Sequence, residues 1–249
     1  MVDMTLLETR GLVKRYSGRC VVDDIFVSIA QRSIVGLLGR NGAGKTTTFR
    51  MIMGMITPES GSVVFEGRDI TKLPMYKRAR LGIGYLSQEP SIFQRLSVRD
   101  NLYAILETMS YTVAERNRRA DILIDHFGLS EVSESQGRFL SGGERRKLEI
   151  ARAMVTDPSL ILLDEPFSGV DPIAVEDLQR EIRRLVASGV SILVTDHNVE
   201  RTLEVVDKAY IIDHGKVIGS GSPAEIVRNE TVRKLYLGST FDGDEFDEK

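Results

Sequence analysis

The sequence predicts an α/β fold with a mostly parallel sheet at its core, an N-terminal antiparallel β subdomain and an inserted α-helical subdomain. Two observations predict it. After residue 146, fully apolar strands alternate with amphipathic helices, which is typical of a parallel sheet covered on both faces. Between residues 90 and 145, apolar residues recur at helical spacing instead, so a helical segment interrupts the series of strands.

The N-terminal part of the chain is rich in predicted strands. Residues 6–12 and 21–29 carry β-branched and apolar side chains on either side of a polar turn at 17–19. Further short strands are expected at 33–38, 61–67 and 81–88.

A glycine-rich loop joins the strand at 33–38 to a helix that begins near Thr47. Its residues spell the P-loop pattern G-x-x-x-x-G-K-T and are Gly39, Arg40, Asn41, Gly42, Ala43, Gly44, Lys45 and Thr46. The glycines let backbone N–H groups turn towards one anion, Lys45 adds a positive charge, and the Thr46 hydroxyl can bind Mg²⁺. Phosphates would then lie at a helix N-terminus, which favours negative charge. The alternative is a glycine-rich turn without a ligand.

The middle of the chain is predicted to be helical. Ser97 begins one helix. Its apolar face is expected to comprise Leu102, Ile105, Leu106 and Met109. The run from Thr112 to Glu115 fits a capping box that begins a second helix, and Gly128 is a natural end for it.

The C-terminal half alternates between strands and helices. An apolar strand at 160–163 ends in Asp164 and Glu165, and a second at 190–194 ends in Asp196 and His197. The helix between them starts at 171–172, and its apolar face comprises Val175, Leu178, Ile182 and Leu185. Polar groups at the carboxyl ends of such strands line the ligand crevice, so these four polar side chains should converge with the glycine-rich loop. Residues 209–213 and 216–219 indicate a closing hairpin.

Asp164 and Glu165 indicate phosphate chemistry. An aspartate at a strand end can hold magnesium through water, and the adjacent glutamate can reach the water that attacks the γ-phosphate. The alternative is a pair of acids that begins a surface loop.

A second helix with glycines at its start begins in the run Leu140, Ser141, Gly142, Gly143 and Glu144. Ser141 and Glu144 fit a capping box, which is a sufficient structural explanation by itself. Two glycines nevertheless weaken a helix by roughly 1 kcal/mol each, and backbone N–H groups exposed to an anion would account for them. Because this start and the P-loop fall in separate subdomains, we infer that one nucleotide meets both only if the second comes from another copy of the protein.

Three further residues are weaker candidates. Gln88 could ligate magnesium or sense the γ-phosphate, or it could be an ordinary polar surface residue. His197 could bond a γ-phosphate oxygen, and its position in the crevice favours that over a purely structural role. Tyr16 could stack on an adenine ring, although an exposed tyrosine proves nothing by itself.

Composition narrows the class of protein. The chain has 249 residues, 42% hydrophobic and 28% charged, and a net charge of −3 that gives no broad basic field for nucleic acid. We see no apolar run long enough to cross a membrane and no secretion signal. The single cysteine, Cys20, cannot form an internal disulfide, and together these features favour the cytosol. Residues 241–249 indicate an acidic, frayed tail.

Together these residues resemble the nucleotide-binding domain of ABC transporters along almost the whole chain. The matching motifs are Tyr16 under adenine, Walker A at 39–46, the Q-loop at Gln88, the signature at 140–144, Walker B with the catalytic glutamate at 160–165, the D-loop at 168–171 and the switch histidine His197. The resemblance implies one P-loop triphosphatase domain. It divides into 1–89 and 146–240 as catalytic core with β subdomain, 90–145 as helical signature subdomain and 241–249 as tail.

A closer resemblance is also present. Residues 89–98, 196–199 and 236–238 look like those of the ATPase subunits of lipopolysaccharide-export ABC transporters, with branched-chain amino-acid importers as the nearest competitors. The acidic extension after Gly238 departs from the expected pattern.

The resemblance implies an ATPase that forms a head-to-tail homodimer around two molecules of ATP with Mg²⁺. Residues 39–47, Tyr16 and Gln88 would bind nucleotide in one copy. The other copy would contribute Ser141, Gly142, Gly143, Glu144 and Asp171. The implied metal ligands are Thr46, Gln88 and Asp164, and the implied catalytic residues are Glu165 and His197.

Partners and location follow from the same resemblance. Phe93 is the candidate contact to two polytopic membrane subunits, unless it is a local core residue. The protein would be cytoplasmic and peripheral on the inner membrane through those subunits.

We expect in-line attack of water on ATP, with Lys45, magnesium and the loop amides stabilising the developing charge. Glu165 would polarise the water and His197 would contact the γ-phosphate. Two rivals are an ABC ATPase of translation or DNA repair that transports nothing, and a regulatory module without useful catalysis. The chain carries no tandem domain or long coiled coil, and it retains Glu165 and His197, which disfavours both.

Overall fold

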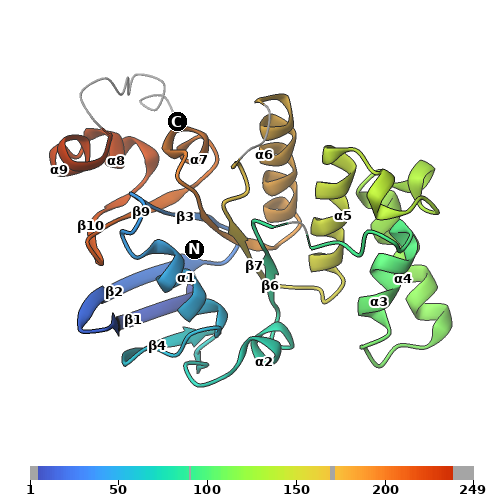
Figure 1. Ribbon diagram of the computed structural model, residues 1–249, viewed down its shortest axis with the longest axis horizontal. Coiled ribbons are helices and arrows are strands. Elements are labelled where there is room, and N and C mark those ends of the chain that lie inside the picture. Colours follow the sequence, from blue (N-terminus) through green and yellow to red (C-terminus); the bar gives the residue numbers. More distant parts are fainter. Residues whose placement is uncertain (1–4, 90, 169–171, 238–249) are drawn as a thin grey trace.

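Two sheets form the framework of the molecule in the computed structural model, which describes residues 5–89, 91–168 and 172–237 (Figure 1). The smaller sheet is antiparallel and has the strand order β2-β1-β4-β5. Its strands are β1 (Thr5–Tyr16), β2 (Arg19–Ala30), β4 (Ser60–Phe65) and β5 (Arg68–Asp69). Ser17 and Gly18 both have positive φ, 48° and 81°, so a two-residue turn closes the β1–β2 hairpin.

The larger sheet has the order β10-β9-β3-β8-β7-β6, and all its strands are parallel except β10. Its strands are β3 (Ile34–Gly39), β6 (Ile83–Leu86), β7 (Leu160–Asp164), β8 (Ser191–Thr195), β9 (Lys208–Asp213) and β10 (Lys216–Gly221). Because β3, β7 and β8 are parallel neighbours, their carboxyl ends meet at one edge. The strand predicted at 81–88 is shorter, so Gln88 lies two residues beyond its end.

Helices cover both faces of the parallel sheet. On one face, α1 (Lys45–Met53) packs against the antiparallel sheet and the large strands through one hydrophobic cluster. On the other face lie α5 (Gly142–Met154), α6 (Pro172–Ala187), α7 (Val199–Leu203) and α8 (Pro223–Arg228), which share a second cluster. The chain also forms α2 (Met75–Ala79), α9 (Glu230–Val232) and the π-helical turn η3 (Arg233–Leu237). The predicted α6 face is buried throughout, with Ile182 fully enclosed.

A helical lobe lies to one side of the sheet, at the right of Figure 1. It contains α3 (Val98–Leu106), α4 (Val113–His126) and the short 3₁₀ turns η1 (Ser130–Val132) and η2 (Gly137–Phe139), and α5 connects it to the core. Thr112 caps α4 as predicted, but the reciprocal half of the expected capping box is absent. The Glu115 carboxylate instead pairs with Arg118 and Arg119, whose guanidinium groups are stronger partners than a backbone N–H.

The buried Arg78 fixes the end of α1 opposite to the P-loop. Its side chain has no solvent exposure and donates to the carbonyl oxygens of Met51 at 2.8 Å and of Leu73 at 2.8 Å. Burial lowers its pKa to about 10. A charged group at the C-terminus of α1 completes the unpaired carbonyls of its last turn and complements the helix dipole.

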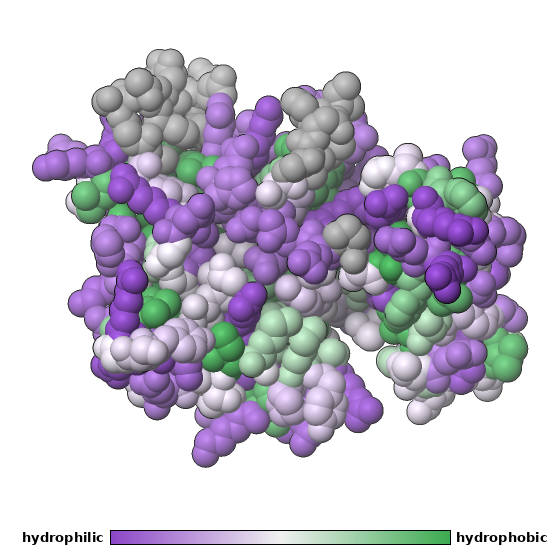
Figure 2. All heavy atoms as spheres, in the orientation of Figure 1, coloured by the Kyte–Doolittle hydropathy of each residue, from purple (hydrophilic) through white to green (hydrophobic). Residues whose placement is uncertain are grey.

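Among residues 5–89, 91–168 and 172–237, no helix has both the length and the apolar composition needed to cross a membrane. Figure 2 shows a mostly hydrophilic face with small, scattered hydrophobic patches.

Candidate nucleotide site

The P-loop takes its shape from glycines that the surrounding chain requires. A Cβ on Gly39 would lie 2.1 Å from the carbonyl oxygen of Ile212, and one on Gly44 would lie 2.5 Å from that of Val21. Both residues also have positive φ. Gly44 occupies the N-cap of α1 without any side-chain cap, so the first N–H groups of the helix have no partner from a capping side chain. The loop is therefore locked into place with its helix start open to an anion.

Lys45 lies at the first position of α1 and is 6% exposed. Its ammonium donates to the carbonyl oxygens of Gly39 at 2.6 Å and Arg40 at 3.0 Å. Burial lowers the pKa of Lys45, and the nearby carboxylates of Glu165, Asp196 and Asp164 oppose that effect. A positive charge held partly out of water attracts phosphate more strongly than one on the surface.

Asp164 ends β7 at the carboxyl edge of the sheet and could hold Mg²⁺. Its Oδ2 accepts a long hydrogen bond of 3.4 Å from the Tyr85 hydroxyl. Burial, with the like charge of Glu165 as the next cause, raises the pKa of Asp164. A divalent cation would offset both effects, and hydroxyl and carboxylate oxygens such as those of Thr46 and Asp164 are the ligands magnesium prefers. Within the described ranges, no group of three His, Cys, Asp or Glu side chains forms a closed metal cage, so such an ion would depend on the phosphates as well.

Glu165 follows Asp164 and lies at the centre of a polar cluster. Its φ is +46°, an unfavourable value for a residue other than glycine, and its N–H donates to Thr195 O at 2.7 Å. Gln88 Nε2 donates to Glu165 Oε2 at 2.9 Å, and His197 Nδ1 lies 3.5 Å from the same oxygen. The Glu165 carboxylate thus lies next to an amide and an imidazole, both of which belong to solvent-exposed residues.

Asp196 is a buried neighbour of this cluster and holds its backbone through hydrogen bonds. It is fully buried, and its two carboxylate oxygens accept from the N–H groups of Phe167 at 3.0 Å and Asn198 at 2.8 Å. Its Oδ1 also lies 3.6 Å from His197 Nδ1. Asp196 thereby links the loop that follows β7 to the loop that follows β8, and it fixes the position of the backbone around His197.

At the start of α5, which also carries glycines, the first residues of the helix form their own capping box. Ser141 and Glu144 form both halves of a capping box, as predicted: Glu144 N–H donates to Ser141 Oγ at 3.3 Å, and Ser141 N–H donates to Glu144 Oε2 at 2.8 Å. The Ser141 hydroxyl also donates to Glu144 Oε2 at 2.7 Å. The hydrogen bond from the Ser141 hydroxyl lowers the pKa of Glu144. Gly142 and Gly143 are exposed, have no positive φ, and have no atom within 4 Å of an added Cβ. Nothing in the described chain requires them to be glycine.

A cleft of about 630 Å³ lies between α5 and α6. Gln88 and Glu165 line it together with Gly142 and Gly143, so the structure brings the second helix start towards the Glu165 cluster. The P-loop residues 39–47 do not line this cleft. Figure 1 likewise places α1 and α5 on different sides of β6 and β7. The two glycine-bearing starts therefore do not form one phosphate cradle within the described part of a single copy.

The two aromatic candidates are both on the surface. Tyr16 is 45% exposed at the β1–β2 turn, with Lys14 Nζ 5.6 Å from its ring centre. Phe93 is 48% exposed, which is against a local core role, and the Arg152 guanidinium lies 4.7 Å from its ring centre. Asp171 and the preceding residues 169–170 lie outside the described residues, as do Pro90, Gly238 and the acidic tail.

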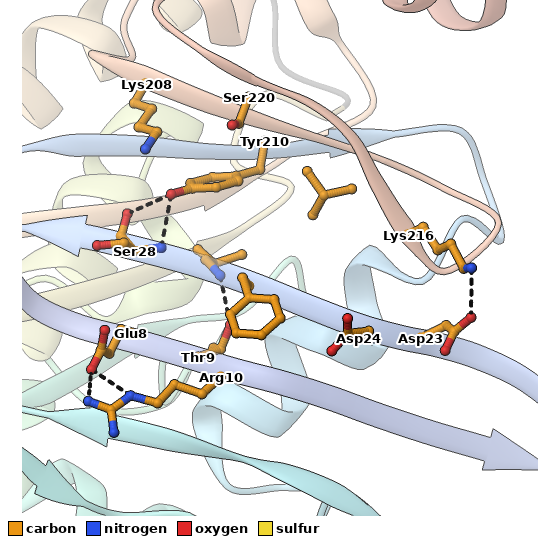
Figure 3. Close-up of a pocket in the computed structure, with 13 residues that line it drawn as sticks. Glu8, Thr9, Arg10, Asp23, Asp24, Ser28, Lys208, Tyr210, Lys216 and Ser220 are labelled. Atoms are coloured by element: carbon orange, nitrogen blue, oxygen red, sulfur yellow. Dashed lines mark hydrogen bonds and ion pairs between the residues drawn. The ribbon is translucent and has the colours of Figure 1, made fainter.

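Sequence reasoning missed two tyrosines at the site. Tyr85 approaches Asp164 as described above, and Gly39 N–H donates to the Tyr236 hydroxyl at 3.0 Å. Burial raises the pKa of Tyr236 to about 12. Tyr236 belongs to η3, nearly two hundred residues from the P-loop in sequence, so no local pattern could connect them. A second groove, between β2 and the β9–β10 hairpin, is lined by no residue of the P-loop, and its charged side chains include the ion pair of Asp23 with Lys216 (Figure 3).

Comparisons with known proteins agree with this geometry. A family model described as ABC transporter matches residues 22–168. A second, described as Branched-chain amino acid ATP-binding cassette transporter, matches residues 216–242.

Curated relatives match nearly the whole chain. It is 50% identical over 236 residues to the lipopolysaccharide export system ATP-binding protein LptB of Acidithiobacillus ferridurans, covering 95% of this chain and 98% of that protein. It is 50% identical over 239 residues to the protein of the same name from Escherichia coli strain K12, covering 96% and 99%.

Solved structures show the same fold. An ATP-binding cassette of an ABC transporter in its ADP conformation superposes with a TM-score of 0.85 at 25% identity, covering 94% of this chain and 99% of that one. The cbiO1 protein from Clostridium perfringens, part of the cbiONQ transporter complex, gives 0.84 at 26% identity, covering 97% and 98%.

Proposed function

The chain belongs to the ABC transporter family, and from that premise we propose that it is the ATP-hydrolysing subunit of a transporter that extracts and exports lipopolysaccharide. One observation carries the choice of cargo: identity of about half extends over almost the full length of both this chain and the lipopolysaccharide-export relatives. The Glu165 cluster supports the proposed chemistry: Glu165 directly follows Asp164, the proposed metal ligand, and its Oε2 lies 2.9 Å from Gln88 Nε2 and 3.5 Å from His197 Nδ1.

ATP would bind through its phosphates at the P-loop, where the open start of α1 and Lys45 meet the negative charge. Magnesium would bind between the phosphates, Thr46 and Asp164, with Gln88 as a further oxygen ligand, and would stabilise charge on the transferring phosphoryl group. Glu165 orients and deprotonates the attacking water. His197, which shares Glu165 Oε2 with Gln88, is placed to contact the γ-phosphate once Gln88 turns to the metal.

Two copies would form the working unit, head to tail. The start of α5 would meet the phosphates bound at the P-loop of the other copy. Two observations support this: the P-loop residues do not line the cleft at the start of α5, and no atom of the described chain outside the helix's own backbone lies within 4 Å of a Cβ added to Gly142 or Gly143. Hydrolysis would then require dimer formation and would depend on residues from both copies.

Membrane subunits would dock on the helical lobe. Phe93, Leu96, Val113, Ile122 and Phe139 are large hydrophobic residues exposed there. Phe93 is on a well-held loop, since the fully buried Asn101 accepts from Phe93 N–H at 2.8 Å and donates to Phe93 O at 3.0 Å. A half-exposed aromatic ring that is held in place and packed against the Arg152 guanidinium is a suitable anchor for a helix of a membrane subunit. Such partners would hold the protein on the cytoplasmic face of the inner membrane.

The proposal is tested in two steps. Purified protein should release phosphate from Mg·ATP, and Glu165→Gln should reduce the rate at least about 100-fold while retaining ATP binding. The intact complex is then isolated from native membranes and its membrane subunits identified. Subunits whose reconstituted complex moves lipopolysaccharide in an ATP-dependent way support the cargo, and subunits of an amino-acid importer contradict it.

A second candidate is the ATPase of a branched-chain amino-acid importer. It is favoured by the family model that matches residues 216–242. The same isolation of membrane subunits decides between the two.

A further inference from the structure

Thr195, the last residue of β8, has a buried hydroxyl without a partner. The residue is 1% exposed, and its Oγ1 makes no hydrogen bond within the described ranges. Other buried threonines are satisfied: Thr48 donates to Gly44 O at 3.0 Å and Thr202 to Asn198 O at 2.7 Å. An unpaired buried hydroxyl costs roughly 1–3 kcal/mol, so a valine of nearly the same shape would suit the fold better.

The register of the sheet places Thr195 directly beside Asp164. The two residues are paired partners across β7 and β8, and strands lie about 4.8 Å apart. Side chains alternate between faces along a strand. Leu162 and Leu193, two residues before Asp164 and Thr195, both belong to the cluster that contains Phe49 of α1. Asp164 and Thr195 therefore project from the same face, the one covered by the helix that follows the P-loop.

Asp164 lacks good hydrogen-bond donors. Within the described ranges, its side chain accepts one bond, the 3.4 Å contact from Tyr85. Magnesium needs this carboxylate ionised and held in one orientation. A second donor on the neighbouring strand would supply both, and a charge-assisted bond of this kind is roughly twice as strong as a neutral one.

We propose that Thr195 is a positioning residue for the metal ligand Asp164: when Mg·ATP is bound, its hydroxyl donates a hydrogen bond to the Asp164 carboxylate. The change needs only a rotation of the threonine side chain between staggered positions. The rotation breaks no hydrogen bond to the residues that the structure describes, because the hydroxyl makes none with them. The inference rests on the proposed function in one respect, namely that Asp164 serves a nucleotide-bound magnesium ion.

Two substitutions separate the hydroxyl from the bulk of the side chain. Thr195→Val removes the hydroxyl and keeps the shape, and Thr195→Ser keeps the hydroxyl. Both are made in a Glu165→Gln background so that ATP persists, and ATP binding is measured by calorimetry with magnesium and with a chelator. Thr195→Val should weaken binding in magnesium about tenfold, as expected for one charge-assisted hydrogen bond, and leave binding in the chelator unchanged. Thr195→Ser should restore binding in magnesium to within about threefold of the background.

The melting temperature without nucleotide is a second readout, and for Thr195→Val it should not fall even though the binding of Mg·ATP weakens. Thr195→Val should leave it unchanged or raise it, because the substitution removes an unpaired polar group. Thr9→Val is the matched control in β1: the Thr9 hydroxyl donates to Ile25 O at 3.2 Å. It also accepts from Val27 N–H at 2.8 Å, and Figure 3 labels Thr9. Thr9→Val should lower the melting temperature and leave the binding of Mg·ATP unchanged.

Three results would overturn the inference. They are unchanged Mg·ATP binding in Thr195→Val, an equal loss of binding with and without magnesium, and a lowered melting temperature that marks a packing role. Failure of the proposed function looks different, because the Glu165→Gln background itself would then bind ATP no better with magnesium than without it.

Discussion

The starts of α1 and α5 both carry glycines and both lie near the Glu165 cluster, yet they are built differently. In the P-loop the chain itself requires the glycines, because a Cβ on Gly39 or Gly44 would lie within 2.1 or 2.5 Å of a carbonyl oxygen. At α5 an added Cβ on Gly142 or Gly143 meets nothing within 4 Å among the residues that the structure describes, its own helix backbone aside. The α1 start has no side-chain cap, whereas α5 has a complete capping box. The fold itself thus requires the glycines at the start of α1, whereas nothing in the described chain requires those at the start of α5.

The largest expected effect is on the P-loop side. Gly44→Ala places a Cβ against Val21 O at a residue with φ of +110°, so we expect the free energy of unfolding to fall by about 3 kcal/mol or more. Chemical denaturation measures it. Gly42→Ala is the control, because Gly42 has a positive φ but open space, and should lose only about 1 kcal/mol. Equal losses in the two variants would remove the steric argument.

Gly143→Ala should leave the stability of the fold intact and impair ATP hydrolysis instead. The added methyl group meets no atom within 4 Å in the described part of the chain beyond its own helix backbone, and alanine favours a helix over glycine, so stability should stay constant or rise by up to about 1 kcal/mol. ATP hydrolysis should nevertheless fall about tenfold, because the methyl group lies on the surface that would meet the partner's phosphates. An unchanged hydrolysis rate would mean that these glycines serve no close approach.

Ser141 allows capping to be separated from phosphate contact. Ser141→Ala should cost about 1 kcal/mol of stability, measured by denaturation, because it removes the cap. Ser141→Asn caps about as well as serine, so stability should hold, but its larger amide replaces the hydroxyl and should reduce hydrolysis. Full activity in Ser141→Asn would leave capping as the only role of this position.

The smallest expected effect concerns Asp164 and pH. Its raised pKa means that the folded state favours the protonated form, so an ionised Asp164 lowers stability as pH rises above the ordinary value of 3.8. Asp164→Asn should therefore raise the melting temperature of the nucleotide-free protein near neutral pH, and this gain should vanish in acid below pH 3.8. A gain that persisted in acid would point to packing rather than charge.

Much of the fold could be predicted because the signals were local. Apolar runs predicted β7 and β8, the capping serines Ser97 and Ser141 predicted where α3 and α5 begin, and the order of elements predicted the parallel sheet. The comparisons confirm the fold, and the roles of the individual site residues remain predictions.

What escaped prediction depends on distant pairs. Tyr236 contacts Gly39 through a tertiary hydrogen bond that no spacing in the sequence encodes. Gln88 and Glu165 were both predicted at the site, but their direct hydrogen bond was not. The Glu115 carboxylate pairs with two arginines instead of accepting the expected hydrogen bond from the N-cap backbone, because both guanidinium groups lie within about one helical turn. In the sequence, Thr195 simply follows an apolar strand. Only the register of β7 and β8 shows that it lies beside Asp164.

Mixing two defective variants tests most directly whether each ATP is held between two copies. Lys45→Ala impairs the P-loop and Ser141→Arg blocks the start of α5, each in a Glu165→Gln background so that bound ATP is retained. If the site is shared, a mixed dimer contains one site in which both halves are intact. The two variants should then form ATP-dependent dimers only when mixed, retaining about one ATP per mixed dimer, as measured by sedimentation with labelled nucleotide. A mixture that binds no more ATP than either variant alone, or Ser141→Arg alone dimerising around ATP like its parent, would contradict the account.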